Sequence, residues 1–212
     1  MQFTINRDIL LKSLNYVQGI VEKKNTLPIL SNVLIKAENK SLHIIATDLD
    51  IVFYDEISDL KIEREGTTTT TAAVLFDILR KISPSSSISF NLVSSNKLSL
   101  KAENSDFNLL CLPVDNFPSY NDDFKSIKIN INSKKLLSLL NKTKIAISND
   151  DTRHYLNGIF LHITESNGKV YLSGVATDSH RLSYSSTEIG QIEDFNSLIL
   201  PKKTVYQLCS LL

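Results

Sequence analysis

The chain has 212 residues, of which 42% are hydrophobic and 22% charged, and its 23 Lys and Arg residues balance its 23 Asp and Glu residues. This composition is typical of a globular protein and excludes an intrinsically disordered chain. No hydrophobic run approaches the roughly 18 residues that a membrane span needs, and the N-terminus lacks a signal-peptide pattern. Because Cys111 and Cys209 are the only cysteines, we expect a cytoplasmic protein with no disulfide framework and no cysteine-rich zinc site. No metal or cofactor is expected.

Two helices and several short strands are predicted in the first 125 residues. Asn6 can cap a helix in which Leu10, Leu14 and Val17 form one hydrophobic face. A second helix is predicted over 72–81. β-branched residues and two-residue alternation predict strands over 33–36, 42–46, 51–54, 67–71, 87–92, 97–102 and 107–112. Two helices packed on antiparallel sheet give this unit an α+β fold.

The second part of the chain repeats the first. LSNVLI at 30–35 corresponds to LNGIFL at 156–161, an offset of 126 residues. ATD at 46–48 corresponds to ATD at 176–178, an offset of 130 residues. The four extra residues can be accommodated in the predicted turn at 164–169. Matches in the same order along both halves predict a tandem duplication of a unit of about 125 residues.

Residues 1–125 are therefore expected to form one complete domain, and residues 126–212 a second, incomplete domain. The repeat predicts a strand over 129–131, a helix capped by Asn132 and a last helix that begins near Pro201. About three more strands should follow that last helix, so the sequence is interpreted as part of a longer chain.

Positive charge is concentrated in the expected helices. The stretches 7–24, 72–81, 133–144 and 201–212 carry formal charges of +2, +1, +4 and +2, whereas the neutral chain leaves −9 for the rest. If all four helices lie on one side of the sheet, that surface would bind DNA phosphates without reading bases. The alternative is that these lysines are simply solvated. The candidate DNA contacts on the later helices are Lys134, Lys135, Lys202 and Lys203.

One short segment could suggest catalysis. Ser179 and His180 would be the nucleophile and base of a Ser/His hydrolase. Adjacent residues in a strand point to opposite faces, however, and no nucleophile elbow surrounds the serine. A hydrolase is therefore the weaker hypothesis, and no catalytic residue is assigned.

The same segment is better explained as a tight turn. Thr177 and Asp178 can bond the backbone, and the matching residues 47–48 suit an equivalent turn in the first unit. What the second unit adds is HRL at 180–182, so these residues are the better candidates for a function specific to that unit. A module that only binds peptide motifs, without surrounding DNA, is a third hypothesis.

A set of motifs in fixed order resembles the bacterial DNA polymerase III beta subunit, the sliding-clamp family. The motifs are TLPIL at 26–30, ATDLD at 46–50, FDILR at 76–80, DNFP at 115–118, YLNG at 155–158 and ATDSHRL at 176–182. The resemblance implies a DNA clamp fold with three similar domains per chain, of which the third would be absent here. It also implies a head-to-tail homodimer that forms a ring around double-stranded DNA, with helices lining the hole. Such a protein is a non-catalytic processivity factor that binds the DNA polymerase III catalytic subunit and the clamp loader through linear motifs.

The resemblance also assigns roles to individual residues. The DNA contacts would be Lys24, Asn149, Arg153, His154 and Tyr155. The partner-peptide pocket would be formed by Leu156, Thr177, Ser179, His180, Arg181 and Leu182. The dimer edge would be the strand segment from Phe107 to Leu109. Five residues depart from the family pattern: Lys24, Ala73, Asp106, His154 and Ser179.

Overall fold

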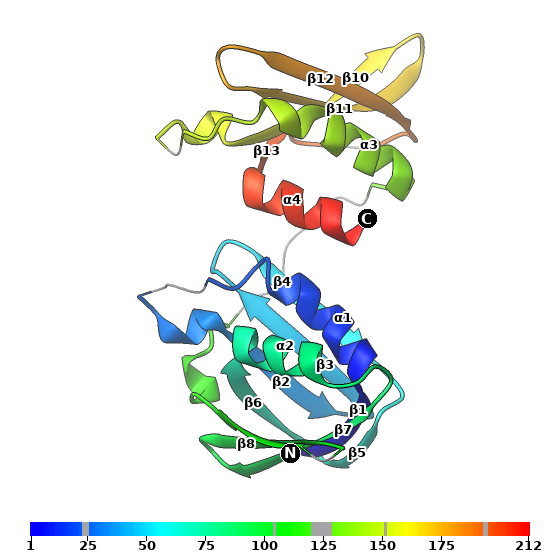
Figure 1. The fold of residues 1–212 in the computed structure, drawn as a ribbon. Helices are drawn as coiled ribbons and strands as arrows, with labels where there is room; N and C mark the ends of the chain where they lie inside the picture. Colours follow the sequence, from blue (N-terminus) through cyan, green and yellow to red (C-terminus); the bar gives the residue numbers. More distant parts are fainter. Residues whose placement is uncertain (23–25, 104, 120–128, 151, 193–194) are drawn as a thin grey trace. The chain divides into compact units, whose positions relative to one another are not determined.

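The computed structural model describes residues 1–22, 26–103, 105–119, 129–150, 152–192 and 195–212 (Figure 1). Lys24 thus lies outside the described residues. The chain divides into two compact units, Met1–Asn121 and Asp122–Leu212, and each has its own hydrophobic core. None of the helices in these described ranges is long and apolar enough to span a membrane.

Unit 1 is built from two antiparallel sheets and two helices. Its strands are β1 (Gln2–Asn6), β2 (Asn32–Glu38), β3 (Ser41–Thr47), β4 (Val52–Ile57), β5 (Lys61–Arg64), β6 (Gly66–Thr71), β7 (Ser87–Ser94), β8 (Lys97–Ala102) and β9 (Ser105–Leu110). The strand order is β5-β1-β7-β8-β9 in one sheet and β4-β3-β2-β6 in the other. A short 3₁₀ turn, η1 (Pro28–Ser31), precedes β2, and a second, η2 (Val114–Asn116), follows β9.

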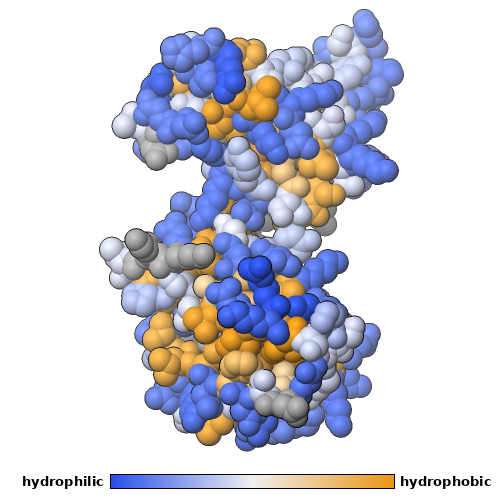
Figure 2. Space-filling view, viewed as in Figure 1, coloured by the Kyte–Doolittle hydropathy of each residue, from blue (hydrophilic) through white to orange (hydrophobic). Residues whose placement is uncertain are grey.

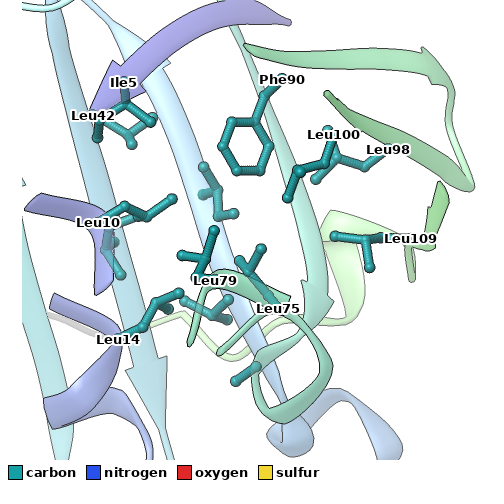
Figure 3. Close-up of a cluster of buried hydrophobic side chains, with 14 of the residues drawn as sticks. Ile5, Leu10, Leu14, Leu42, Leu75, Leu79, Phe90, Leu98, Leu100 and Leu109 are labelled. Carbon is teal, nitrogen blue, oxygen red and sulfur yellow. The ribbon is translucent and has the colours of Figure 1, made fainter. Parts of the chain in front are cut away.

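The two helices of unit 1 lie side by side and share one core with both sheets. These helices are α1 (Arg7–Val17) and α2 (Ala72–Lys81). Leu10 and Leu14 of α1 and Leu75 and Leu79 of α2 are fully buried, as is Phe90 of β7 (Figure 3). The Asn6 side chain accepts the Asp8 N–H at 2.8 Å, which confirms the predicted N-cap. The hydrophobic faces predicted from the sequence are therefore the faces that pack.

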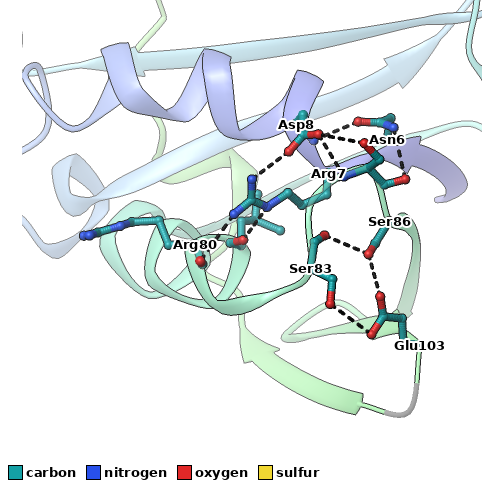
Figure 4. Close-up of polar contacts among 9 residues, drawn as sticks. Asn6, Arg7, Asp8, Arg80, Ser83, Ser86 and Glu103 are labelled. Carbon is teal, nitrogen blue, oxygen red and sulfur yellow. Dashed lines mark hydrogen bonds and ion pairs between the residues drawn. The ribbon is translucent and has the colours of Figure 1, made fainter.

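Arg7 connects the start of α1 to the end of α2 (Figure 4). Its Nε donates to the Leu79 carbonyl at 2.7 Å and its Nη2 to the Arg80 carbonyl at 3.3 Å. The guanidinium thereby satisfies carbonyl groups at the C-terminus of α2, where a positive charge is favourable. Its Nη1 also contacts the Asp8 carboxylate at 2.6 Å, and the Arg7 side chain is only 13% exposed. Arg7 is thus used within the fold and does not add to a basic surface.

Unit 2 has one antiparallel sheet with two helices packed against each other. Its elements are α3 (Ser133–Thr143), β10 (Gly158–Ser166), β11 (Lys169–Thr177), β12 (Leu182–Ile189), β13 (Leu198–Pro201) and α4 (Lys202–Leu211), with short 3₁₀ turns η3 (Lys144–Ala146) and η4 (His154–Leu156). The strand order is β12-β11-β10-β13. Leu139 and Leu140 of α3, Val205 of α4 and Ile159 of β10 are buried together. A Cβ on Gly174 of β11 would lie 2.8 Å from Leu139, so this glycine permits the close approach of α3.

The α+β fold class and the arrangement of two helices on antiparallel sheets are confirmed. The helix predicted over 72–81 has the predicted ends. One strand was missed in the sequence, and one strand prediction is wrong. The charged segment Lys61–Arg64 forms β5, which was not predicted from the sequence, and residues 129–131 do not form a strand. The counterpart of 129–131 in unit 1 is β1, which pairs with β5 on one side and with β7 on the other. No described strand pairs with 129–131.

Candidate DNA-contact and peptide-pocket loops

The turn between β11 and β12 is held by its own side chains. The Asp178 Oδ1 accepts the backbone N–H groups of His180 and Arg181, each at 3.0 Å. The Thr177 Oγ1 accepts the Ser179 N–H at 3.2 Å and donates to the Arg181 carbonyl at 2.7 Å. The N–H groups of Arg181 and His180 lower the pKa of the Asp178 carboxyl below its ordinary value, so Asp178 is charged at neutral pH.

Unit 1 contains the same turn between β3 and β4. The Asp48 Oδ1 accepts the N–H groups of Asp50 at 3.1 Å and Ile51 at 2.7 Å, and the Thr47 Oγ1 accepts the Leu49 N–H at 3.0 Å. Leu49 has φ +84° and its counterpart Ser179 has φ +78°. The turn therefore belongs to the repeated fold, as the sequence comparison indicated, and only its outward side chains differ between the units.

A second loop of unit 2 ends in the short turn η4. The buried Ser148 donates its N–H to the Leu156 carbonyl at 3.0 Å, and the Leu156 N–H bonds to the Arg153 carbonyl at 2.8 Å. His154 and Tyr155 are exposed, Tyr155 to 67%, while Leu156 is half-buried. The loop thus presents two exposed rings to solvent and turns the leucine partly inward.

Arg153 joins this loop to the β11–β12 turn. Its Nε donates to the Asp150 Oδ2 at 2.8 Å and its Nη1 donates to the Ser179 Oγ at 2.8 Å. Hydrogen bonds from Thr152, followed by the one from Arg153, lower the pKa of the Asp150 carboxyl. The structure therefore brings together a residue expected to contact DNA and a residue expected in the peptide pocket.

This geometry does not support the hydrolase hypothesis. The Oγ of Ser179 is bonded to Arg153, and a guanidinium has no acceptor that could take the serine proton. Among the described residues, no hydrogen bond joins the Ser179 Oγ to the His180 ring, which was the base of that hypothesis. Within the described ranges, no three His, Cys, Asp or Glu side chains gather in a way that could hold a metal ion.

The remaining pocket residues lie in and after the turn. His180 and Arg181 are exposed, and the Arg181 Nε pairs with the Asp178 Oδ2 at 2.9 Å. Leu182, the first residue of β12, is 67% exposed. An exposed leucine of this size is a candidate contact for a partner's hydrophobic side chain.

The predicted basic residues have different surroundings. Lys134 and Lys135 are exposed in the first turn of α3, which the Asn132 side chain caps by accepting the Lys134 N–H at 3.0 Å. Lys202 is half-buried and its Nζ donates to the Asn149 Oδ1 at 2.5 Å, while Lys203 is half-buried. Lys134 and Lys135 are therefore the most accessible of the four to a phosphate.

The helical side of unit 1 is less basic than the charge count suggested. Ile9 of α1 and Val74 of α2 are exposed to 48% and 47%. In Figure 1, α1 and α2 lie in front in unit 1. Figure 2, viewed from the same side, shows hydrophobic surface among hydrophilic side chains on this face of unit 1. Within each unit the helices contact each other, so each pair shares a side, but the helical stretches of unit 2 carry a formal charge of +6 against +3 in unit 1.

The predicted dimer edge is an open edge of a sheet. β9 is the last strand in its sheet, so one side of its backbone has no neighbouring strand among the described elements. Phe107 packs against the core and Leu109 is only 4% exposed, whereas Leu110 is 81% exposed. A cavity of about 230 Å³ along this edge is lined by Thr70, Thr71, Val74, Asn108, Leu109 and Leu110. Leu110 was not among the predicted edge residues, although strand alternation placed it on the face opposite Leu109.

Comparison with known proteins agrees with this architecture. The family model for the N-terminal domain of the DNA polymerase III beta subunit matches residues 1–121. The family model for its central domain matches residues 130–212. The chain belongs to the DNA polymerase III beta subunit family. The resemblance inferred from the motifs is thus confirmed.

The similarity to individual clamps extends over almost the whole chain. The beta sliding clamp of Caulobacter vibrioides is 38% identical over 207 residues, which cover 97% of this chain and 55% of that protein. The clamp of Pseudomonas aeruginosa is 37% identical over 214 residues, covering 100% of this chain and 57% of its own length. The chain therefore spans little more than half the length of these relatives.

Solved clamp structures have the same fold. The beta sliding clamp of C. crescentus, solved with polyethylene glycol bound, superposes with a TM-score of 0.93 at 37% identity over 100% of this chain and 56% of that chain. A sliding clamp from Bartonella birtlesii, bound to griselimycin, gives a TM-score of 0.92 at 39% identity with the same coverage.

Proposed function

We propose that this chain is part of a DNA sliding clamp, a non-catalytic processivity factor that keeps the replicative polymerase on double-stranded DNA. The observation that carries the proposal is the agreement of the entire chain with a solved beta sliding clamp at a TM-score of 0.93 and 37% identity. At that identity, shared fold and shared sequence together support a shared role.

The proposed mechanism is a topological tether. In this proposal, residues 1–125 form the first clamp domain, residues 126–212 belong to the second, and a third domain and a second copy complete the ring. The second copy would meet the β9 edge at Phe107 and Leu109. A ring needs only weak contacts to DNA, because encirclement rather than affinity prevents its loss. Replication by such a ring would take place in the cytoplasm.

Sequence-independent DNA contacts suit such a tether. Cations that bind phosphates supply affinity without base readout. The exposed Lys134 and Lys135 and the Arg153 loop supply cations in unit 2, and the half-buried Lys202 and Lys203 add two more. Asn149, His154 and Tyr155 would add contacts from the same loop.

The polymerase III catalytic subunit and the clamp loader would bind through short linear motifs. The candidate pocket combines half-buried Leu156 with the turn residues from Thr177 to Leu182. Leu182 exposes 67% of its surface, which offers a hydrophobic contact to such a motif. The Bartonella clamp was solved bound to griselimycin, which supports ligand binding by this type of protein.

Leucine truncation tests the pocket. Leu156→Ala and Leu182→Ala should each weaken binding of a labelled peptide from the polymerase catalytic subunit by roughly ten-fold or more, because a buried anchor contributes about 2 kcal/mol or more. Leu49→Ala is the matched control, since Leu49 is an exposed leucine in the equivalent turn of unit 1. Fluorescence polarisation titrations give the affinities. Equal affinities for wild type and both pocket variants would show that the pocket is elsewhere.

A further inference from the structure

One hydrogen bond connects two functional loops that lie apart in the sequence. The loop formed by 148–150 and 152–156 carries the expected DNA contacts, and the turn 177–182 carries most of the expected peptide pocket. The Arg153 Nη1 donates to the Ser179 Oγ at 2.8 Å across 26 sequence positions. We propose that this hydrogen bond couples DNA binding to peptide binding, so that each ligand raises the affinity for the other. The coupling rests on the sliding-clamp function proposed above.

Both partners of this hydrogen bond are held in place by neighbours. The Asp150 Oδ2 accepts the Arg153 Nε, while its Oδ1 accepts the N–H and hydroxyl of Thr152 at 3.0 and 2.6 Å. On the other side, the Thr177 Oγ1 accepts the Ser179 N–H at 3.2 Å, and the φ of +78° fixes the direction of the serine side chain. The guanidinium and the hydroxyl are therefore oriented toward each other by bonds within their own loops.

The internal repeat shows that the fold does not require this pair. Leu27 and Leu49 occupy the positions in unit 1 that correspond to Arg153 and Ser179. The backbone is the same in both units: the Leu30 N–H bonds to the Leu27 carbonyl at 3.1 Å, as in η4, and Leu49 shares the positive φ of Ser179. Two leucines are compatible with the shared framework. The Arg–Ser pair is therefore an addition to the unit that carries both sets of candidate contacts.

Because the hydrogen bond restrains both loops, the coupling should be positive: each ligand strengthens binding of the other. A ligand that immobilises one loop also restrains the other through the Arg153–Ser179 bond, so the second ligand loses less conformational entropy on binding. Linkage then requires the effect to be reciprocal. The Arg153 side chain is 38% exposed, so its guanidinium remains accessible to a phosphate. One such hydrogen bond corresponds to roughly two- to ten-fold in affinity.

The coupling is measured with two probes on the purified chain. The labelled peptide from the polymerase catalytic subunit, used above to test the pocket, reports on the turn 177–182, and a short mixed-sequence DNA duplex reports on the DNA loop. Fluorescence anisotropy gives the Kd of each probe alone and in the presence of saturating concentrations of the other. In the wild type, each probe should lower the Kd of the other by the same factor, roughly two- to ten-fold.

Variants at Ser179 identify the hydrogen bond as the cause. Ser179→Gly suits the positive φ and removes the hydroxyl, so the coupling factor should fall to one, whatever happens to the separate affinities. Ser179→Asn also tolerates this backbone and keeps an acceptor oxygen, so it should preserve coupling. Asn167→Gly is the matched control, because Asn167 has φ +50° in the β10–β11 turn.

Three outcomes would overturn the proposal, and they are distinguishable. If both probes bind the wild type with a coupling factor of one, the coupling is absent although the clamp function stands. If the factor persists in Ser179→Gly, the hydrogen bond is not its cause. If either probe fails to bind the wild type, the coupling proposal fails, whereas retention on circular DNA decides the proposed function separately.

Discussion

The carboxylate of Asp178 organises the turn in which most of the candidate pocket residues lie. It accepts two backbone N–H groups and pairs with the Arg181 Nε at 2.9 Å. Its pKa is lowered in the folded state, first by the N–H of Arg181 and then by that of His180. A carboxyl with a lowered folded pKa contributes stability above its unfolded pKa of about 4, and this stability is lost as the pH falls through the folded pKa.

Acid unfolding tests this assignment. Between pH 5 and pH 3, the free energy of unfolding should fall less steeply for Asp178→Asn than for the wild type, because the variant cannot release that linked stability. Urea unfolding at a series of pH values gives the two slopes. Asp77→Asn, at an exposed position of α2, is the control and should keep the wild-type slope. Parallel curves for Asp178→Asn and wild type would contradict the pKa assignment.

Sequence reasoning singled out both Ser179 and Arg153, but not the hydrogen bond between them. The turn chemistry of Thr177 and Asp178 was predictable because such side chains bond the backbone two or three residues ahead. The Arg153–Ser179 bond was not, because it depends on how two loops 26 positions apart meet in the tertiary structure. A signal was present nonetheless: the repeat places leucines at both corresponding positions of unit 1.

Helix capping explains why the first helix of each unit, α1 and α3, begins where it does. Asn6 accepts the Asp8 N–H, and Asn132 accepts the N–H groups of Lys134 and Lys135 at 3.0 and 3.4 Å. Asn6→Ala and Asn132→Ala should each lower the free energy of unfolding by about 1 kcal/mol, because an N–H group loses its acceptor. Denaturant unfolding measures the change. Asn141→Ala, at an exposed position in the middle of α3, should not lower the free energy of unfolding. If Asn6→Ala and Asn132→Ala were as stable as Asn141→Ala, the capping role would be contradicted.

The start of α3 is also where the proposed DNA contacts are most accessible. Replacing Lys134 and Lys135 by Ala should weaken binding equally for unrelated duplex sequences and reduce the salt slope by about one for each phosphate that is no longer neutralised. Titrations over a series of salt concentrations provide both quantities. Lys97→Ala with Lys101→Ala, on the exposed face of β8, is the matched control. An unchanged affinity would mean that the α3 lysines are simply solvated.

Elements with strong local signals were predictable, and those that depend on neighbours were not. Amphipathic helices such as 72–81 have a period that the sequence displays directly. The charged strand β5 forms because it pairs with β1, which no local pattern reveals. Conversely, 129–131 has the composition of a strand, yet no described strand pairs with it. Strand formation is decided by tertiary pairing rather than by composition.

Duplication explains the arrangement of the molecule. Each unit supplies two contacting helices and antiparallel sheet, and the shared turns at Asp48 and Asp178 show that one framework was used twice. Unit 2 adds lysines on α3, the Arg153–Ser179 bond and exposed Leu182 to that framework. Family membership was recognisable from ordered motifs, whereas the exposed Leu110 at the β9 edge required the structure.

The central claim is that the protein is held on DNA by encirclement. The most direct test uses the protein purified from its own cells, loaded onto nicked circular DNA by its clamp loader and separated from free protein by gel filtration. We predict that it remains with the circle and is released when a restriction enzyme linearises the DNA, because a ring can slide off an end. Equal retention on circular and linear DNA would contradict topological tethering.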